Sequence, residues 1–255
     1  MSTDTPGTSG TQGTETYGGG AGTYLDPALT AALARDPSAL DLRTTRAAVV
    51  FWDISGYSRI ADALQYDRTT ELLGNIGEFL TGAVLAVQRN HGIVHKFLGD
   101  GLIAVFGSSL GAPAAATATA GNRPDSALAR PALTAAAELR AEFPQMADRW
   151  VASSGAPDPR IWQVGLRCGI AIGDVHHGRL GLGPMSALAL LGHAVNLASR
   201  CCAGAEPGQV LVSERVRAAG VTAFGFRPAG PPRVLKHISG AQQLWAAGAP
   251  HREAR

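Results

Sequence analysis

The chain has 255 residues, of which 45% are hydrophobic and 16% charged, and its formal net charge is +2 at pH 7. That length and composition indicate a globular protein with one good domain and a tail, or two small domains. A charge so close to balance offers no strongly basic surface, so nucleic acid is not expected as a partner. The three cysteines are an odd number without metal-type spacing, which argues against a disulfide framework or a zinc site and fits a reducing cytoplasm.

The N-terminal segment, residues 1–23, is dominated by Gly, Thr and Ser and is expected to be disordered. It contains acids instead of a basic region followed by an apolar core, so no signal peptide is expected. The uncharged stretch 101–120 is rich in small residues and contains Pro113, which fits a strand running into a loop better than a membrane span. We therefore expect a soluble, cytoplasmic protein without direct membrane insertion.

The first half of the chain predicts helices around a strand and a hairpin. Apolar residues recur at helical spacing in the long segment 67–88, and the Gly99-Asp100-Gly101 turn joins two apolar strands across 94–106. The other predicted elements are a short helix over 25–35, a strand over 47–53, a helix over 58–64, a loop over 107–123 and a helix over 131–150 with Pro131 in its first turn.

The second half predicts further strands around one helix. A strand block over 161–173 would have 175–180 as its hairpin partner, and weak strands are expected near Phe224, Leu235 and Leu244. Between these lie a strand over 187–191, a helix over 193–202, a strand over 209–213 and a short helix over 214–219. This order describes one α+β domain whose sheet is mainly antiparallel, with helices on one face. The expected boundaries are a tail over 1–23, a lead-in helix and linker over 24–46, the domain over 47–247 and a C-terminal tail over 248–255.

Two aspartates occupy similar settings at strand ends. Asp53 closes an apolar run and is followed by a Ser-Gly turn, and Asp100 stands at the tip of the hairpin. Either one alone is more typical of an ordinary turn residue. Together they suggest a divalent-cation site, because magnesium and manganese prefer oxygen ligands such as one or two carboxylates plus substrate phosphates.

A second polar pair, Asn196 and Arg200, lies four residues apart and therefore on one helix face. A guanidinium suits phosphate oxygens, and a carboxamide suits a sugar or phosphate oxygen. Taken alone, this pair is more typical of a solvated helix face.

Four segments carry a resemblance to a known family: 51–58 (FWDISGYS), 96–107 (KFLGDGLIAVFG), 192–200 (GHAVNLASR) and 207–213 (PGQVLVS). In this order and near this spacing they resemble the catalytic domain of class III nucleotidyl cyclases, the adenylate and guanylate cyclase type, over roughly residues 47–245. The resemblance implies a ferredoxin-like α+β fold. It also implies conversion of a nucleoside triphosphate into a 3′,5′-cyclic nucleotide second messenger and pyrophosphate by two-metal catalysis.

The resemblance also implies a role for each matching residue. Asp53 and Asp100, with the carbonyl of Ile54, would hold two divalent cations, magnesium or manganese. Asn196 would orient the ribose, and Arg200 would stabilise charge on the α-phosphate in the transition state.

The remaining implied contacts concern the phosphates and the partner chain. Lys236 is similar to the family's triphosphate-binding lysine, and the backbone amides from Ser55 through Gly56 to Tyr57 would cradle phosphates at a helix start. Tyr57 is open to two interpretations, a contact with the base or a cap on the core. Such cyclases are dimers in which one chain gives the metals and the other gives the Asn and Arg, so a homodimer would have two composite sites.

The base-reading positions favour a pyrimidine. Lys96 aligns with the lysine that reads adenine in adenylate cyclases, whereas guanylate cyclases resemble each other in having an acid there. The partner position falls on Ala189, which cannot accept from the adenine amino group, at a cost of roughly 1–3 kcal/mol. Uracil has no such amine, so UTP fits best, then CTP, as in the stand-alone pyrimidine cyclases of bacterial antiphage systems. An adenylate cyclase making cAMP stays the alternative, with Ser186 as a substitute acceptor.

A further alternative is an inactive cyclase fold that serves as a dimerisation module. Degenerate members usually lose a metal Asp or the Asn/Arg pair, and all four residues are present here, so activity is favoured. Strand alternation predicts that His95 points away from Lys96, and that His176 and His177 point to opposite faces and cannot share a ligand. The sequence names neither the activating signal nor the downstream effector of the cyclic nucleotide.

Overall fold

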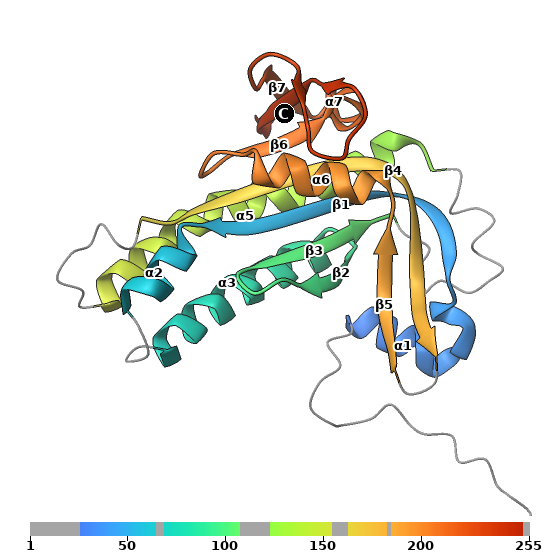
Figure 1. Ribbon diagram of the computed structural model, residues 1–255, viewed down its shortest axis with the longest axis horizontal. Helices are drawn as coiled ribbons and strands as arrows, with labels where there is room; N and C mark the ends of the chain where they lie inside the picture. Colours follow the sequence, from blue (N-terminus) through green and yellow to red (C-terminus); the bar gives the residue numbers. More distant parts are fainter. Residues whose placement is uncertain (1–25, 65–68, 108–122, 155–162, 183–184, 252–255) are drawn as a thin grey trace, which may run out of the picture.

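The computed structural model describes residues 26–64, 69–107, 123–154, 163–182 and 185–251. An eight-stranded sheet forms its centre, in the order β2-β3-β1-β4-β6-β10-β7, with β5 paired to β4 (Figure 1). The pairs are antiparallel except for β4 with β6. The strands are β1 Arg43–Ser55, β2 Gly92–Phe97, β3 Gly101–Phe106, β4 Gly165–Leu182, β5 Met185–Leu191, β6 Val210–Ser213, β7 Phe224–Pro228 and β10 Leu244–Pro250, and β8 Arg233–Val234 pairs with β9 Ala241–Gln242 in a separate small sheet.

Helices cover both faces of this sheet, so the prediction of helices on one face was wrong. On one side, α5 packs against β1, in the apolar cluster that contains Val50 and Trp52, and α3 packs against β2 and β3; on the other side, α6 packs against Ala47 and Val49 of β1 (Figure 1). The reason is that β1 is apolar on both faces, as expected of a central strand covered twice. The helices are α1 Pro27–Arg35, the 3-10 helix η1 Pro37–Leu40, α2 Tyr57–Leu64, α3 Thr69–Arg89, α5 Asp125–Ser154, α6 His193–Ala203 and α7 Glu214–Gly220.

The lead-in segment is tied to the sheet through Asp26. One oxygen of its carboxylate caps α1 by accepting from the Ala28 amide at 2.9 Å, and the other accepts from the Val94 amide of β2 at 3.0 Å. The predicted helix over 25–35 is therefore confirmed. Strand β1 begins at Arg43, so part of the expected linker belongs to the sheet, and the expected tail over 1–23 lies outside the described residues.

Two element predictions were wrong in the middle of the chain. The segment 175–180 is the continuation of β4 and not its hairpin partner, because Gly173 and Asp174 pair with β1 and do not turn. The partner is β5. Pro131 lies inside α5 and not in its first turn, since the helix already begins at Asp125. Buried residues on either side of it, Leu128 and Leu133, hold this part of the helix against the core and offset the missing proline amide.

No helix within the described ranges is both long enough and apolar enough to span a membrane.

Candidate active site

The register of the central strands places the two predicted metal ligands together. Asp53, near the end of β1, pairs with Gly101 of β3, and Asp100 immediately precedes Gly101. The Ile54 amide donates to the Asp100 carbonyl at 3.3 Å, which fastens the hairpin tip to β1. Gly101 permits this approach, because a Cβ there would lie 2.5 Å from the Trp52 carbonyl oxygen. The strand end and the hairpin tip therefore form one acidic site.

The electrostatics of this site favour a bound cation. Burial raises the pKa of Asp100 above its usual value, and the nearby charge of Asp53 raises it further. A divalent ion bound between these two half-buried carboxylates would reduce their repulsion. Within the described part of the chain no three His, Cys, Asp or Glu side chains cluster, so a closed zinc-type site is not formed there. Two carboxylates with a backbone carbonyl fit the open oxygen coordination of magnesium or manganese.

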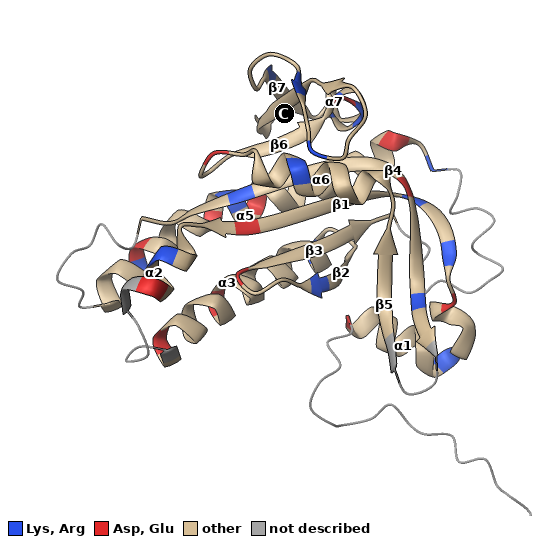
Figure 2. Ribbon diagram, viewed as in Figure 1, with Lys and Arg blue, Asp and Glu red and all other residues tan. Residues whose placement is uncertain are grey.

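Arg167 belongs to this site and was missed by the sequence reasoning. It lies opposite Asp53 on β4, and both its Nε, at 3.1 Å, and its Nη2 donate to one carboxylate oxygen of Asp53. Figure 2 shows acidic and basic residues together at the ends of β1 and β4 nearest α2. The available signal was a lone charged residue within the apolar run 164–173. A charge on a strand of that kind needs a partner.

The turn after Asp53 is built as a helix start. Gly56 has φ +88°, a conformation that favours glycine, and a Cβ there would lie 2.7 Å from the Gln163 carbonyl oxygen. Ser55 and Gly56 are both half-buried, directly before the first turn of α2.

Tyr57 belongs to the core. It is 5% exposed, and its hydroxyl donates to the Leu72 carbonyl. Burial raises its pKa to about 12, with smaller contributions from the charges of Asp100 and Glu71. Of the two interpretations of Tyr57, these contacts favour the cap on the core over the contact with the base.

Asn196, Arg200 and Lys236 form a second group. Asn196 is exposed and Arg200 half-buried on α6, and the Arg200 Nε donates to the Lys236 carbonyl at 3.2 Å. The Lys236 side chain is exposed. Among the residues with described positions, no hydrogen bond or ion pair joins this group to Asp53 or Asp100. The acidic site and this second group are therefore not joined by such a bond within one chain, although α6 itself packs against β1 and β4.

The base-reading candidates lie on β2 and β5. Lys96 is exposed, Ala189 is half-buried, and the side chain of the alternative acceptor Ser186 lies outside the described residues. A β-bulge between Val94 and Lys96 makes His95 the extra residue of β2. His95 is nevertheless buried and Lys96 exposed, which confirms the prediction that the two side chains point apart. His176 is exposed and His177 is 1% exposed, which confirms that they point to opposite faces.

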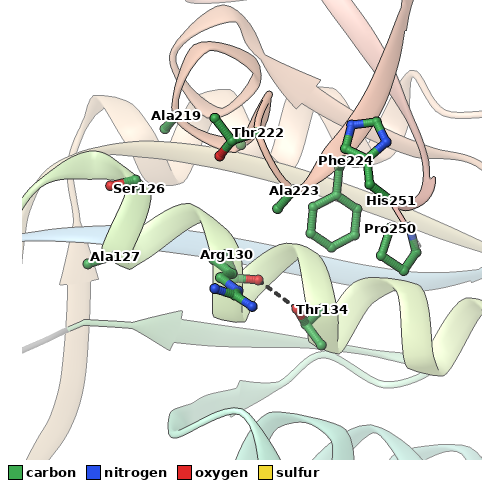
Figure 3. Close-up of a pocket in the computed structure, with 11 residues that line it drawn as sticks. Ser126, Ala127, Arg130, Thr134, Ala219, Thr222, Ala223, Phe224, Pro250 and His251 are labelled. Atoms are coloured by element: carbon green, nitrogen blue, oxygen red, sulfur yellow. Dashed lines mark hydrogen bonds between the residues drawn. The ribbon is translucent and has the colours of Figure 1, made fainter. Parts of the chain in front are cut away.

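A cavity of about 600 Å³ lies elsewhere, between α5, α7 and the neighbouring ends of β7 and β10 (Figure 3). Arg130 and Thr134 of α5 are on one side of it, and Phe224, Pro250 and His251 on the other. None of the predicted site residues lines this cavity. It does not belong to the acidic site.

The fold and the acidic site together define a class of protein. Residues 42–235 match the family of the adenylate and guanylate cyclase catalytic domain, and the chain belongs to this family. The finding confirms the resemblance on which the site residues were chosen.

The chain is also similar to curated proteins that are longer than it is. An uncharacterised protein of Mycobacterium tuberculosis is 29% identical over 234 residues, which is 91% of this chain and 36% of the relative. The chain thus spans about a third of the length of the curated relatives it matches.

Among solved structures, the adenylyl cyclase CyaB from P. aeruginosa is similar with a TM-score of 0.70 and 22% identity, covering 85% of this chain and 100% of that one. A non-canonical dimeric guanylyl cyclase domain of the RhoGC fusion protein from Blastocladiella emersonii has a TM-score of 0.61 and 20% identity, over 82% and 99% of the two chains. At such identities these likenesses establish the α+β fold.

Proposed function

We propose that this chain is an active class III nucleotide cyclase that converts a nucleoside triphosphate into a 3′,5′-cyclic nucleotide and pyrophosphate. The observation that carries the proposal is the meeting of Asp53 and Asp100 at the ends of neighbouring strands, with Arg167 as their only charged partner among the described residues. Two carboxylates that share one guanidinium carry excess negative charge, so binding of a cation would be favourable here.

Asp53, Asp100 and the Ile54 carbonyl would hold two divalent cations, magnesium or manganese. Bound there, the cations would lower the pKa of the ribose 3′-hydroxyl and offset the charge of the triphosphate. With cations bound at Asp53, Arg167 would be free to donate to phosphate oxygens. The amides of Ser55 and Gly56 would donate to the same phosphates at the start of α2.

The rest of the reaction would use the second group of residues. Arg200 would stabilise the charge on the α-phosphate while the 3′-oxygen forms its new bond to phosphorus and the bond to the departing pyrophosphate breaks; the hydroxyl proton is lost to solvent. Asn196 would orient the ribose, and Lys236 would bind the triphosphate. Because no hydrogen bond or ion pair joins Asn196 or Arg200 to Asp53 or Asp100 in the described part of one chain, we propose a homodimer whose composite sites take one half-site from each copy.

For the base we propose a pyrimidine, with UTP preferred over CTP. Lys96 can donate to a carbonyl of the base, and the Ala189 side chain cannot accept from an exocyclic amine. The product would then be a cyclic pyrimidine nucleotide of the kind used in antiphage signalling. ATP is the alternative substrate, because lysine also suits a ring nitrogen of adenine.

The test is a product assay with purified chain and manganese, in which ATP, GTP, CTP and UTP are offered separately and products are identified by mass. We expect cyclic UMP as the main product and its loss in Asp53→Ala. Cyclic AMP as the main product would contradict the pyrimidine assignment and leave the cyclase activity standing. No cyclic product from any of the four would instead favour an inactive dimerisation module.

A further inference from the structure

His95 is a buried histidine beside the residue that would read the base. It is the extra residue of the β2 bulge, directly before Lys96. Its side chain is 6% exposed, and neither ring nitrogen has a hydrogen-bond partner of good geometry within the described residues. An interior polar group left in this state destabilises the fold, so its presence requires an explanation.

The backbone of Ala189 on β5 is close enough to the His95 ring to affect its pKa. The Ala189 carbonyl attracts the imidazole proton and so favours a raised pKa, but burial has the larger effect and lowers the pKa of His95 overall. Ala189 is the position proposed to pair with Lys96 in base recognition. His95 is therefore a neighbour of both proposed base-reading residues. It precedes Lys96 in the sequence, and its ring is close to the Ala189 backbone.

The strands on both sides of His95 are held in place by the lead-in segment. The Asp26 carboxylate accepts from the Val94 amide, next to His95 in β2. Leu29 of α1 packs with Ile93 of β2 and Leu188 of β5 in one small apolar cluster. This cluster, which also contains Leu40 of η1, joins the strand next to His95 to the strand of Ala189.

The backbone carbonyl of Ala189 is important because the side chain at that position accepts nothing. It is the one acceptor that residue 189 could still offer to the exocyclic amine of adenine or cytosine. A neutral imidazole has one N–H to donate, and a small adjustment of the ring would direct it at this carbonyl. Once engaged by His95, the carbonyl is not available to the base.

We propose that His95 is a specificity-determining positioning residue: it occupies the Ala189 carbonyl, holds β5 at its distance from Lys96, and thereby selects a base with carbonyl acceptors and no exocyclic amine. This inference rests on the proposed cyclase function and identifies the substrate class of that site as a uridine nucleotide.

The charges around His95 favour its neutral form. The charge of Lys96 on β2 lowers the pKa of His95. His95 also interacts electrostatically with His177 on β4, which in turn interacts with Arg43 of β1. The Asp26 carboxylate, which binds β2 next to His95, already accepts from the Val94 and Ala28 amides. Burial and the charge of Lys96 lower the pKa of His95, so the imidazole stays neutral at neutral pH and keeps a single donor.

The experiment measures binding of 3′-deoxy-UTP and 3′-deoxy-ATP, which lack the attacking hydroxyl and bind without reacting, by calorimetry with manganese. The variants are His95→Leu, which removes both nitrogens, His95→Gln, which restores an N–H donor, and His176→Gln as a control on the exposed neighbouring histidine. Melting temperatures check that each variant is folded. The cyclase assay above is run in parallel, so that loss of activity and loss of selectivity are separate results.

We expect His95→Leu to reduce the preference for the uridine over the adenosine nucleotide by about tenfold, mainly through tighter binding of the adenosine nucleotide. His95→Gln should keep the preference within about threefold, and His176→Gln should leave it unchanged. Equal weakening of both nucleotides, or an unchanged ratio in His95→Leu, would overturn the inference. A wild-type chain that binds with this preference but forms no cyclic product would contradict the proposed activity alone.

Discussion

Asp53 and Arg167 face each other across the β1–β4 pair, and the guanidinium donates through two nitrogens to a single oxygen of the carboxylate. The second oxygen of Asp53 accepts no side-chain hydrogen bond from the described residues. The arginine thus provides the positive charge in the acidic site and leaves room for another ligand of Asp53. A structural ion pair and a phosphate-binding arginine are both compatible with this geometry, and they predict different behaviour.

Replacement of Arg167 by Met separates these two roles. If Arg167 also binds substrate, kcat/KM should fall by about 100-fold, because one charge-stabilising donor is lost. The variant should also gain more thermal stability from manganese than the wild type does, since its two carboxylates have no resident cation. Both effects are measured by pyrophosphate release and by melting curves with and without manganese. Arg215→Met, which breaks the more exposed pair with Asp125, is the matched control. Unchanged kcat/KM would assign Arg167 a structural role only.

The raised pKa of Asp100 gives a prediction for stability. A carboxyl whose pKa is higher in the folded state stabilises the fold only when protonated, so this contribution is present below pH 3.8 and is lost as the pH rises through the folded pKa. Asp100→Asn should therefore unfold at a higher temperature than the wild type at pH 7 without metal, and the difference should disappear toward pH 3.8. Its cyclase activity should nevertheless fall by orders of magnitude.

Melting curves from about pH 3.5 to 8, with and without manganese, check this prediction. Manganese should stabilise the wild type and have little effect on Asp100→Asn. A variant that is less stable than the wild type at pH 7 would show that Asp100 stabilises the fold through its hydrogen bonds instead of opposing it through its charge.

The close contact between α6 and β4 gives a third prediction. A Cβ at Gly169 would lie 2.2 Å from the Ala198 carbonyl oxygen and 2.2 Å from the Cys202 amide nitrogen, both backbone atoms of α6. Gly169→Ala should push the helix away, cost about 1–3 kcal/mol of unfolding free energy and lower activity by displacing Arg200. Gly77→Ala is the control, because that glycine lies inside α3 and a Cβ there would meet no atom within 4 Å. It should stabilise the protein by about 0.5–1 kcal/mol. Equal effects of the two substitutions in urea unfolding would contradict the steric argument.

Local sequence patterns predicted the helices and strands that carry the site. The register between strands far apart in the chain determines how these elements come together. The hairpin around Asp100, the strand ending at Asp53 and the helix with Arg200 all followed from spacing and turn residues over short stretches. The partnership of Asp53 with Arg167 depends on how β1 pairs with β4, far along the chain, and no local signal gives that register.

The main error in the strands has the same origin. A strand ending at 173 with a hairpin partner from 175 was predicted, but β1 pairs with β4 across this position and keeps the strand extended. The bulge at His95 is likewise a property of two paired strands. Strand register and its irregularities were therefore beyond what residue types alone could predict.

The separation of the two half-sites within one chain predicts complementation between inactive variants. Asp53→Ala lacks the metal half and Arg200→Ala lacks the transition-state half, so each homodimer should be inactive. After mixing and subunit exchange, half of the dimers combine the two variants, and each of these has one intact site and one that lacks both halves. Activity should return to about one quarter of the wild-type value at equal total chain.

The matched control is a mixture of Asp53→Ala with Asp100→Ala. Both substitutions affect the same half-site, so every site in the mixed dimer lacks one metal ligand and no activity should return. Pyrophosphate release and the mass of the cyclic product are measured for each mixture at several ratios. Recovery in the first mixture and none in the second would establish composite sites. Failure of the first mixture, with exchange confirmed by differently tagged chains, would mean that a single chain assembles the site after a rearrangement.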